Sequence, residues 1–234
     1  ERRDGDIRVE RIAEGLHEPL GIAAVGERIF VMQKQEITEL IDGDGDGWRE
    51  EHRNLNADWG ATSNFHEFGF GLAAVDGHLF AGLGTCVLAG GDACPEQHPD
   101  RGKILKVSVE TGDREFFASG FRTPNGIAAG PPGQLLVTDN QGAWLPASKL
   151  MLVDQGDDFG WRAPSDTGRE RQVRPPALWL PQNEIGNSPT QPLVLTQGPY
   201  AGHILWGDIF NGGIKRGFLE TVEGQLQGAA FHFS

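Results

Sequence analysis

The sequence lacks both a cluster of basic residues and a long apolar run, and each absence argues against a class of protein. Its 234 residues include 20 Lys and Arg against 33 Asp and Glu, which gives a formal net charge of −13. A protein that binds the phosphate backbone needs a basic face, so we predict that this chain does not bind nucleic acid. No run reaches about 18 apolar residues, so the sequence predicts no membrane-spanning helix.

The signatures of several enzyme classes are missing as well. There is no C-x-x-C-H for attaching a c-type haem, no G-x-S-x-G, no P-loop and no dinucleotide fingerprint between a strand and a helix. No window of about a dozen residues shows the apolar stripe of an amphipathic helix. What the sequence does contain is 34 Gly, 14 Pro and 38% hydrophobic residues, which suits a packed domain with many tight turns.

One phrase occurs three times: a short apolar strand, a turn that contains Gly, and a second short apolar strand. The copies are GIAAVGERIFV at 21–31, GLAAVDGHLFA at 71–81 and GIAAGPPGQLLV at 126–137. The glycines that open them lie about 50 residues apart, a period typical of β-sheet arrays.

A second set of strands follows the repeated phrase. Strand-like runs at 37–40, 103–107, 149–153 and 214–219 are each followed by a turn rich in Gly and acidic residues. Two hairpins per repeat make a four-stranded unit, which is the content of one propeller blade. We therefore predict a single all-β propeller domain over residues 1–234, with approximate blades at 7–55, 64–119, 120–175 and 177–234.

Four blades are fewer than a closed propeller usually contains. The sequence also stops directly after the strand-like run at 228–233. We therefore expect the chain to be a fragment of a longer protein.

The two cysteines, Cys86 and Cys94, lie eight positions apart in a loop-like stretch that contains glycines. The glycines permit the tight return that a disulfide needs, so the spacing favours a Cys86–Cys94 bridge. Two free thiols and a metal site are the alternatives. A bridge would indicate an extracytoplasmic address, periplasmic or secreted.

The loops that precede the repeated strands are where propellers usually place their functional groups. His66 lies in one of them, among Phe65, Phe68 and Phe70. An imidazole in apolar surroundings stays neutral near pH 7 and can accept a proton as a general base. The alternative is a structural histidine that is hydrogen-bonded to the backbone.

Arg122 occupies a nearly equivalent position before the third copy of the phrase. Its planar guanidinium suits a carboxylate or a quinone oxygen, and a surface salt bridge is the alternative. Because the two residues precede equivalent strands of adjacent repeats, we expect them to face a common cavity.

Three acidic stretches are candidates for binding a metal ion. The run at 42–47 has acids at positions 1, 3 and 5 of a calcium loop, but Arg53 stands where an EF-hand needs Glu, so we interpret it as an acidic hairpin turn. Asp139 and Asn140 follow a strand and offer oxygen ligands, although Asp139 could instead cap a turn. A loop with Asp92, Glu96, His98 and Asp100 reads more simply as solvated.

The order and spacing of several segments resemble the quinoprotein glucose/sorbosone dehydrogenase family of β-propellers, nearest to a branch of large secreted bacterial proteins with c-type haem domains. The resembling segments are 64–85, 101–107, 120–142 with 146–150, 159–161 and 176–220.

The resemblance implies a six-bladed propeller that holds pyrroloquinoline quinone (PQQ) and Ca²⁺ and oxidises a sugar or alcohol, with a c-type cytochrome as a possible electron acceptor. It implies that His66 accepts the hydroxyl proton and that Arg122 binds the quinone, with Lys215 as a candidate for the cofactor-binding lysine. Thr123 departs from the family, which usually has Asn directly after that arginine.

Two other functions remain open at this point. A metal-dependent lactonase would use the phrase Pro124-Asn125-Gly126 together with Asp139, but its early carboxylate, Glu18 or Glu36, is an arbitrary choice. A non-catalytic propeller that binds carbohydrate or protein is the third reading, since a fold does not determine a function.

Overall fold

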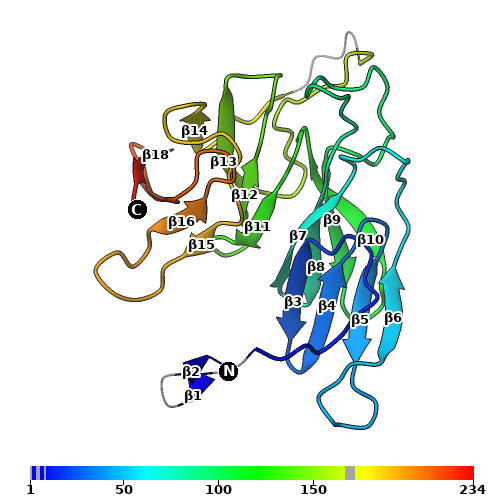
Figure 1. The fold of residues 1–234 in the computed structure, drawn as a ribbon. Coiled ribbons are helices and arrows are strands. Elements are labelled where there is room, and N and C mark those ends of the chain that lie inside the picture. The colour runs from blue at the N-terminus through cyan, green and yellow to red at the C-terminus, as the bar shows by residue number, and fades with distance from the viewer. Residues whose placement is uncertain (1, 4–5, 8, 167–171) are drawn as a thin grey trace.

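The structure, a computed structural model, describes residues 2–3, 6–7, 9–166 and 172–234 (Figure 1). In these residues all regular elements are strands, β1 to β18. No helix in the described part of the chain is long and apolar enough to cross a membrane.

Sixteen of the strands form four antiparallel sheets of four strands each, and every sheet is built in sequence order. The first sheet contains β3 (Gly21–Val25), β4 (Arg28–Met32), β5 (Ile37–Ile41) and β6 (Glu51–Asn56). The second contains β7 (Gly69–Val75), β8 (His78–Leu83), β9 (Lys103–Ser108) and β10 (Arg114–Ser119). The third contains β11 (Gly126–Ala129), β12 (Leu135–Asp139), β13 (Ala147–Val153) and β14 (Leu178–Pro181). The fourth contains β15 (Leu193–Val194), β16 (Ile204–Gly207), β17 (Ile214–Val222) and β18 (Gln225–His232). A short hairpin of β1 (Arg2–Arg3) and β2 (Asp6–Ile7) stands apart.

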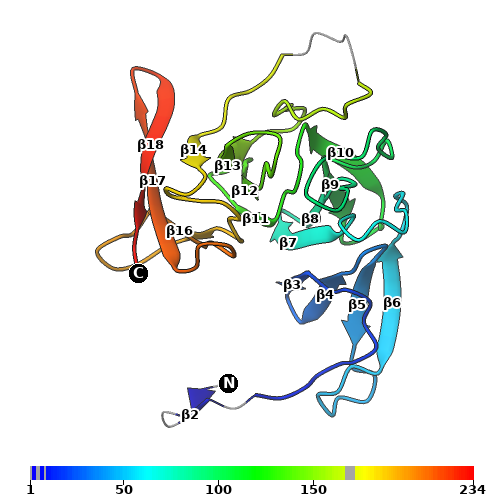
Figure 2. The ribbon, with the colours of Figure 1, turned by 45° about the horizontal axis from the view of Figure 1, so that its top comes forward.

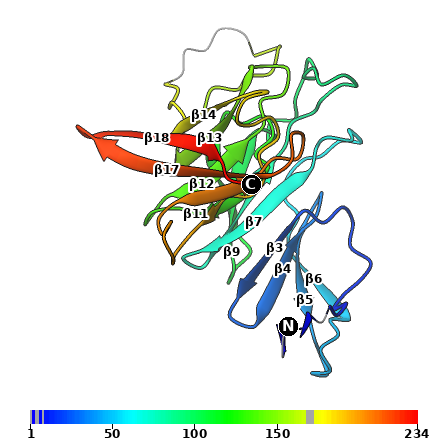
Figure 3. The same cartoon turned by 60° about the vertical axis from the view of Figure 1, so that its left-hand side comes forward.

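These sheets confirm the prediction of an all-β chain made of four-stranded propeller blades. They follow one another along an arc that is open between the first and the fourth sheet (Figure 2). The inner strands β3, β7 and β11 run side by side (Figure 3), and β7 contacts both of the others.

Each junction between neighbouring sheets is filled by apolar side chains. Fully buried Leu and Phe side chains of this kind each contribute about 1.5–3 kcal/mol to folding. The first and second sheets share a cluster that includes Phe30, Met32, Leu79 and Leu105. The second and third share Phe80, Phe117, Ile127 and Met151, and the third and fourth share Leu150, Leu180, Ile204 and Trp206.

The repeated glycines have a steric role at the inner edge of the sheets. A Cβ on Gly21 would lie 2.4 Å from the carbonyl oxygen of Gly71, and one on Gly126 would lie 2.3 Å from the Cα of Gln191. Real Cβ atoms do not approach backbone so closely, so only glycine lets consecutive inner strands meet there. The repeated phrase therefore marks the positions where neighbouring blades touch.

The boundary between the third and fourth blades differs from the expected one. β14 completes the third sheet, although residues 178–181 fall in the range that we assigned to the fourth blade. The reason is the long connection between β13 and β14, which pairs with the outer strand of the second sheet before it returns. Ser119 forms a parallel bridge with Asp158, and the backbone N–H of Trp161 donates to Gly120 O at 2.9 Å.

Candidate functional site

The loops that carry the candidate residues gather at one end of the second and third sheets. Residues 57–68 and 84–102 precede β7 and β9, and residues 120–125 and 140–146 precede β11 and β13. Because neighbouring strands are antiparallel, these four connections emerge at the same end of their sheets.

His66 is held by a backbone carbonyl in a single orientation. Its Nδ1 lies 2.8 Å from Thr85 O, so Nδ1 carries the proton and donates it. Nε2 is then the acceptor, and it lies 3.4 Å from the hydroxyl oxygen of Thr123. Burial, and next the positive charge of Arg122, hold the pKa of His66 below its ordinary value of 6.5, against the opposing effects of the Thr85 hydrogen bond and Glu67. The imidazole is therefore a neutral base at pH 7.

Arg122 is buried, with 5% of its surface exposed. Its Nη2 donates to Gly91 O at 2.8 Å, and its Nη1 lies 3.2 Å from the Thr123 hydroxyl and 3.5 Å from Asn140 O. The described contacts leave Nε–H without a protein acceptor. The guanidinium is thus fixed by three loops and still has donor capacity.

The hydroxyl of Thr123 connects the two candidate side chains. It lies within 3.4 Å of the acceptor nitrogen of His66 and 3.2 Å of a donor nitrogen of Arg122. The structure therefore brings the predicted base and the predicted anion-binding residue to one point, from loops that precede adjacent blades. A polar oxygen of a ligand could meet both groups there.

Asp139 is fully buried beneath this point and anchors the loop that carries Arg122. Its carboxylate accepts hydrogen bonds from the backbone N–H of Arg122, at 3.1 and 3.2 Å, and from that of Thr123, at 2.6 Å. The side chain of Gln141 donates to it as well. Burial raises the pKa of Asp139 from 3.8 to about 6. The backbone N–H groups of Arg122 and Thr123 and the positive charges of Lys149 and Arg122 oppose this shift, because they favour the charged form.

This arrangement does not fit Asp139 and Asn140 as an open pair of calcium ligands. Both carboxylate oxygens of Asp139 already accept N–H donors. Asn140 accepts from the Gly142 N–H at 2.8 Å through Oδ1 and donates to the Ser188 hydroxyl at 3.1 Å. Their polar atoms therefore serve the loops around Arg122.

The other candidate residues do not join this point. Lys215 lies in β17 of the fourth sheet, where its Nζ donates to Gly212 O at 2.9 Å. Asp42, Asp44 and Glu50 have carboxylate oxygens within 4.8 Å of one another, but they lie at the opposite end of β6 from the His66 loop. His98 lies 3.6 Å from Asp100, and Asn125, of the lactonase-like phrase, donates to Pro189 O at 2.9 Å.

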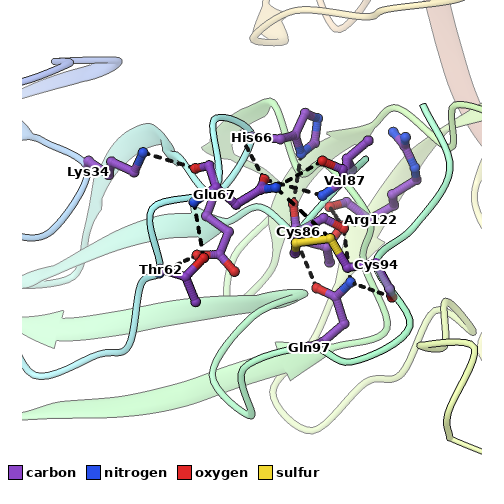
Figure 4. Close-up of a disulfide and its surroundings, with 11 residues drawn as sticks. Lys34, Thr62, His66, Glu67, Cys86, Val87, Cys94, Gln97 and Arg122 are labelled. Atoms are coloured by element: carbon purple, nitrogen blue, oxygen red, sulfur yellow. Dashed lines mark hydrogen bonds between the residues drawn. A yellow bond between two sulfur atoms is a disulfide. The ribbon is translucent and has the colours of Figure 1, made fainter. Parts of the chain in front are cut away.

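Cys86 and Cys94 form a disulfide beside the site, and Figure 4 shows the ends of the His66 and Arg122 side chains on the same side of it. The side chain of Gln97 fixes both ends of the bridge. It accepts from the Cys86 N–H at 2.7 Å and donates to Cys86 O and Cys94 O at 2.9 and 3.2 Å.

Several residues near the site were not predicted from the sequence, among them Thr85 and Lys149. Thr85 acts through its backbone carbonyl, for which side-chain chemistry gives no signal. Lys149 is 2% exposed in β13, donates to Phe159 O at 2.8 Å and interacts electrostatically with Asp139. The one feature of the sequence that could have identified Lys149 is a single charge at the start of an apolar strand. Burial lowers the pKa of Lys149.

Comparison with solved structures identifies similar folds. The chain is similar to a glucose dehydrogenase at 15% identity, with 94% of this chain and 73% of that chain covered and a TM-score of 0.68. It is also similar to the apo-form of the soluble aldose sugar dehydrogenase from Escherichia coli, at 12% identity, 93% and 74% coverage and a TM-score of 0.64. The holo form of the pyranose dehydrogenase PQQ domain from Coprinopsis cinerea matches at 11% identity, 95% and 80% coverage and a TM-score of 0.50. No protein-family model and no curated protein matches the chain. At these identities the likeness establishes that the chain has the fold of these dehydrogenases.

Proposed function

We propose that the protein is a quinone-dependent oxidoreductase that oxidises a carbohydrate hydroxyl, with PQQ as its cofactor. The observation that carries this proposal is the convergence of a neutral imidazole acceptor and a fixed guanidinium on the same hydroxyl, at 3.4 and 3.2 Å. Oxidation of an alcohol needs a base for the O–H proton and an acceptor for the hydride. In this proposal His66 is the base, and Arg122 supplies the cation that binds the hydride acceptor.

The donor set fits an anionic quinone. PQQ carries carboxylates and quinone oxygens, which are acceptors only, and the Arg122 Nε–H is a donor without a protein acceptor among the described contacts. When bound, PQQ supplies the two-electron acceptor for the hydride. Arg122 is 5% exposed, so a ligand would contact only a small part of its surface.

His66 performs the proton step in this proposal. The Thr85 carbonyl holds the Nδ1–H tautomer, so the lone pair of Nε2 faces the Thr123 hydroxyl. A substrate hydroxyl that takes the place of the Thr123 hydroxyl donates its proton to Nε2 as the adjacent C–H bond breaks. The resulting imidazolium releases that proton to solvent in a later step.

The proposal extends to the setting of the enzyme. Because disulfides persist in oxidising compartments, the Cys86–Cys94 bridge supports an extracytoplasmic location. We take the four sheets as blades of one six-bladed propeller domain, and a c-type cytochrome as the electron acceptor. Ca²⁺ belongs to the proposal through the family resemblance alone, since the polar atoms of Asp139 and Asn140 are engaged by the loops around Arg122.

Reconstitution tests this function. The chain is loaded with PQQ, with and without Ca²⁺, and the reduction of an artificial dye is measured with a panel of aldoses. We expect turnover with at least one aldose, and we expect His66→Asn to lower kcat by about 10²–10⁴.

His78→Asn is the matched control. His78 also places its Nδ1 near a backbone carbonyl, at 2.9 Å from Asp76 O, but it lies at the far end of β8 from the site. It should leave kcat unchanged. Sugar binding without turnover would favour a non-catalytic propeller, and an active His66→Asn enzyme would refute the base assignment.

A further inference from the structure

The disulfide closes a small hairpin whose residues belong to none of the four sheets. Val87 and Ala93 form an antiparallel bridge next to Cys86 and Cys94, and the Leu88 N–H donates to Asp92 O at 2.8 Å. Gly90 and Gly91 turn the chain with φ angles of 101° and 100°, which favour glycine. The hairpin thus has a cross-linked base and a glycine tip.

The base of the hairpin holds the His66 loop. Thr85, the residue before the disulfide, accepts from His66 Nδ1 at 2.8 Å. The side-chain amide of Asn64 forms two hydrogen bonds with the hairpin. Its Nδ2 donates to Val87 O at 2.9 Å, and its Oδ1 accepts from the Val87 N–H at 3.3 Å. The same Oδ1 accepts from the backbone N–H of His66 at 2.9 Å.

Both the tip and the base of the hairpin contact Arg122. At the tip, Gly91 O accepts from Arg122 Nη2 at 2.8 Å. At the base, the N–H and the hydroxyl of Thr85 both donate to Arg122 O at 3.0 Å. One cross-linked element therefore contacts the backbone and the side chain of Arg122, and the imidazole of His66.

We propose that the disulfide-closed hairpin, residues 86–94 with Thr85 at its base, is the positioning element that sets His66 and Arg122 relative to each other. This inference rests on the proposed function for its purpose, but its geometry is independent of it. A site needs its groups held within about 0.5 Å, and a cross-link reduces the freedom of the loop that holds them. The hairpin and Thr85 are positioning residues, since they act through His66 and Arg122.

The imidazole of His66 reports on this positioning in the full chain without cofactor. Its NMR titration and its tautomer are measured before and after reduction of the disulfide, with His66→Asn used to assign the signal. With the bridge intact we expect one Nδ1–H tautomer and a midpoint below 6.5. After reduction we expect a mixture of tautomers and a midpoint nearer 6.5, since burial is the largest cause of the lowered pKa.

Circular dichroism and a count of alkylated thiols accompany the reduction. A folded chain with two free thiols and an unchanged tautomer and midpoint would overturn the proposal, because Asn64 and Gln97 would then hold the loop without the bridge. If reduction unfolds the chain, a second variant decides.

Gly91→Ala is that variant, because it moves the tip while the disulfide stays. Alanine at this φ is strained, and we expect the apparent Kd for PQQ to rise about tenfold, the effect of losing one charge-assisted contact. Gly77→Ala is its control: Gly77 also has a positive φ, of 75°, nothing lies within 4 Å of an added Cβ, and its turn lies at the far end of the second sheet. Equal Kd values for the two variants would contradict the positioning role.

The two proposals fail in different ways. If wild type does not bind PQQ but its His66 tautomer and midpoint respond to reduction, the proposed cofactor is wrong and the positioning element stands. If PQQ binds and supports turnover equally before and after the bridge is removed by Cys86→Ala and Cys94→Ala, the function stands and the positioning role is wrong. Alanine variants replace chemical reduction in that assay because quinones react with thiols.

Discussion

At the scale of single residues, burial shifts the pKa values of two side chains at the candidate site, His66 and Asp139. The His66 imidazole stays neutral under burial beside a guanidinium, and the Asp139 carboxyl is fully buried against the backbone of Arg122. The imidazole donates a hydrogen bond to a backbone carbonyl, and the carboxylate accepts hydrogen bonds from backbone N–H groups. The backbone therefore determines where these two side chains point.

Asp139→Asn tests the anchor through the pH dependence of stability. The folded pKa of about 6 exceeds the unfolded value of 3.8, so the folded state binds the proton more tightly. Stability from this group is present below pH 4 and is lost as the pH rises through 6. The stability of wild type relative to Asp139→Asn should therefore fall by about 2 kcal/mol between pH 4 and pH 7.

Urea unfolding of both proteins at several pH values measures this difference. Other groups, such as Glu39, whose pKa is lowered to about 2 by its hydrogen bond to Arg28 against the opposing effect of burial, titrate in both proteins and cancel. Parallel pH profiles for the two proteins would show that Asp139 does not have the raised pKa.

Sequence chemistry predicted residues such as His66 and Arg122, because each is an unusual side chain before a repeated strand. It could not predict Thr85 or Gly91, which act through carbonyl groups that every residue has. It also assigned metal-ligand chemistry to Asp139, whereas the structure engages its oxygens with backbone N–H groups. Which groups contact one another depends on the distances between loops from different repeats, and a single sequence does not contain those distances.

At the scale of elements, the repeated phrase encodes the contact between blades as well as the strands. Short apolar runs on either side of turn glycines predicted the hairpins, and the opening glycines prove to be the points where inner strands touch. The connection from β13 to β14 was not predicted, since its pairing with β10 depends on a strand edge that lies far away in the sequence.

Gly126→Ala should destabilise the chain by about 1–3 kcal/mol, because its Cβ would meet the backbone of Gln191 at 2.3 Å. Gly43→Ala is the matched control, since its Cβ would meet only the flexible end of the Glu50 side chain. The comparison is made by denaturant midpoints at constant m-value. Similar midpoints for both variants would mean that the inner strands do not crowd at the repeated glycines.

At the scale of the whole molecule, the arc of four sheets places two loops of adjacent blades so that their side chains meet. Antiparallel order within each sheet puts the His66 and Arg122 loops at one end, and the contact of β7 with β11 brings them together. The sequence predicted this from equivalent positions in successive repeats. The fourth sheet keeps Lys215, which the family resemblance suggested as a cofactor-binding residue, apart from them in the described contacts.

An anaerobic single-turnover measurement tests whether His66 and Arg122 form one quinone-dependent site. The PQQ-loaded chain is mixed with aldose, and the quinone absorbance is followed in wild type and in His66→Asn. We expect one equivalent of quinone reduced per chain in wild type, and bound but unreduced quinone in His66→Asn. Reduction at the same rate in both proteins, or no quinone bound by wild type, would contradict this expectation.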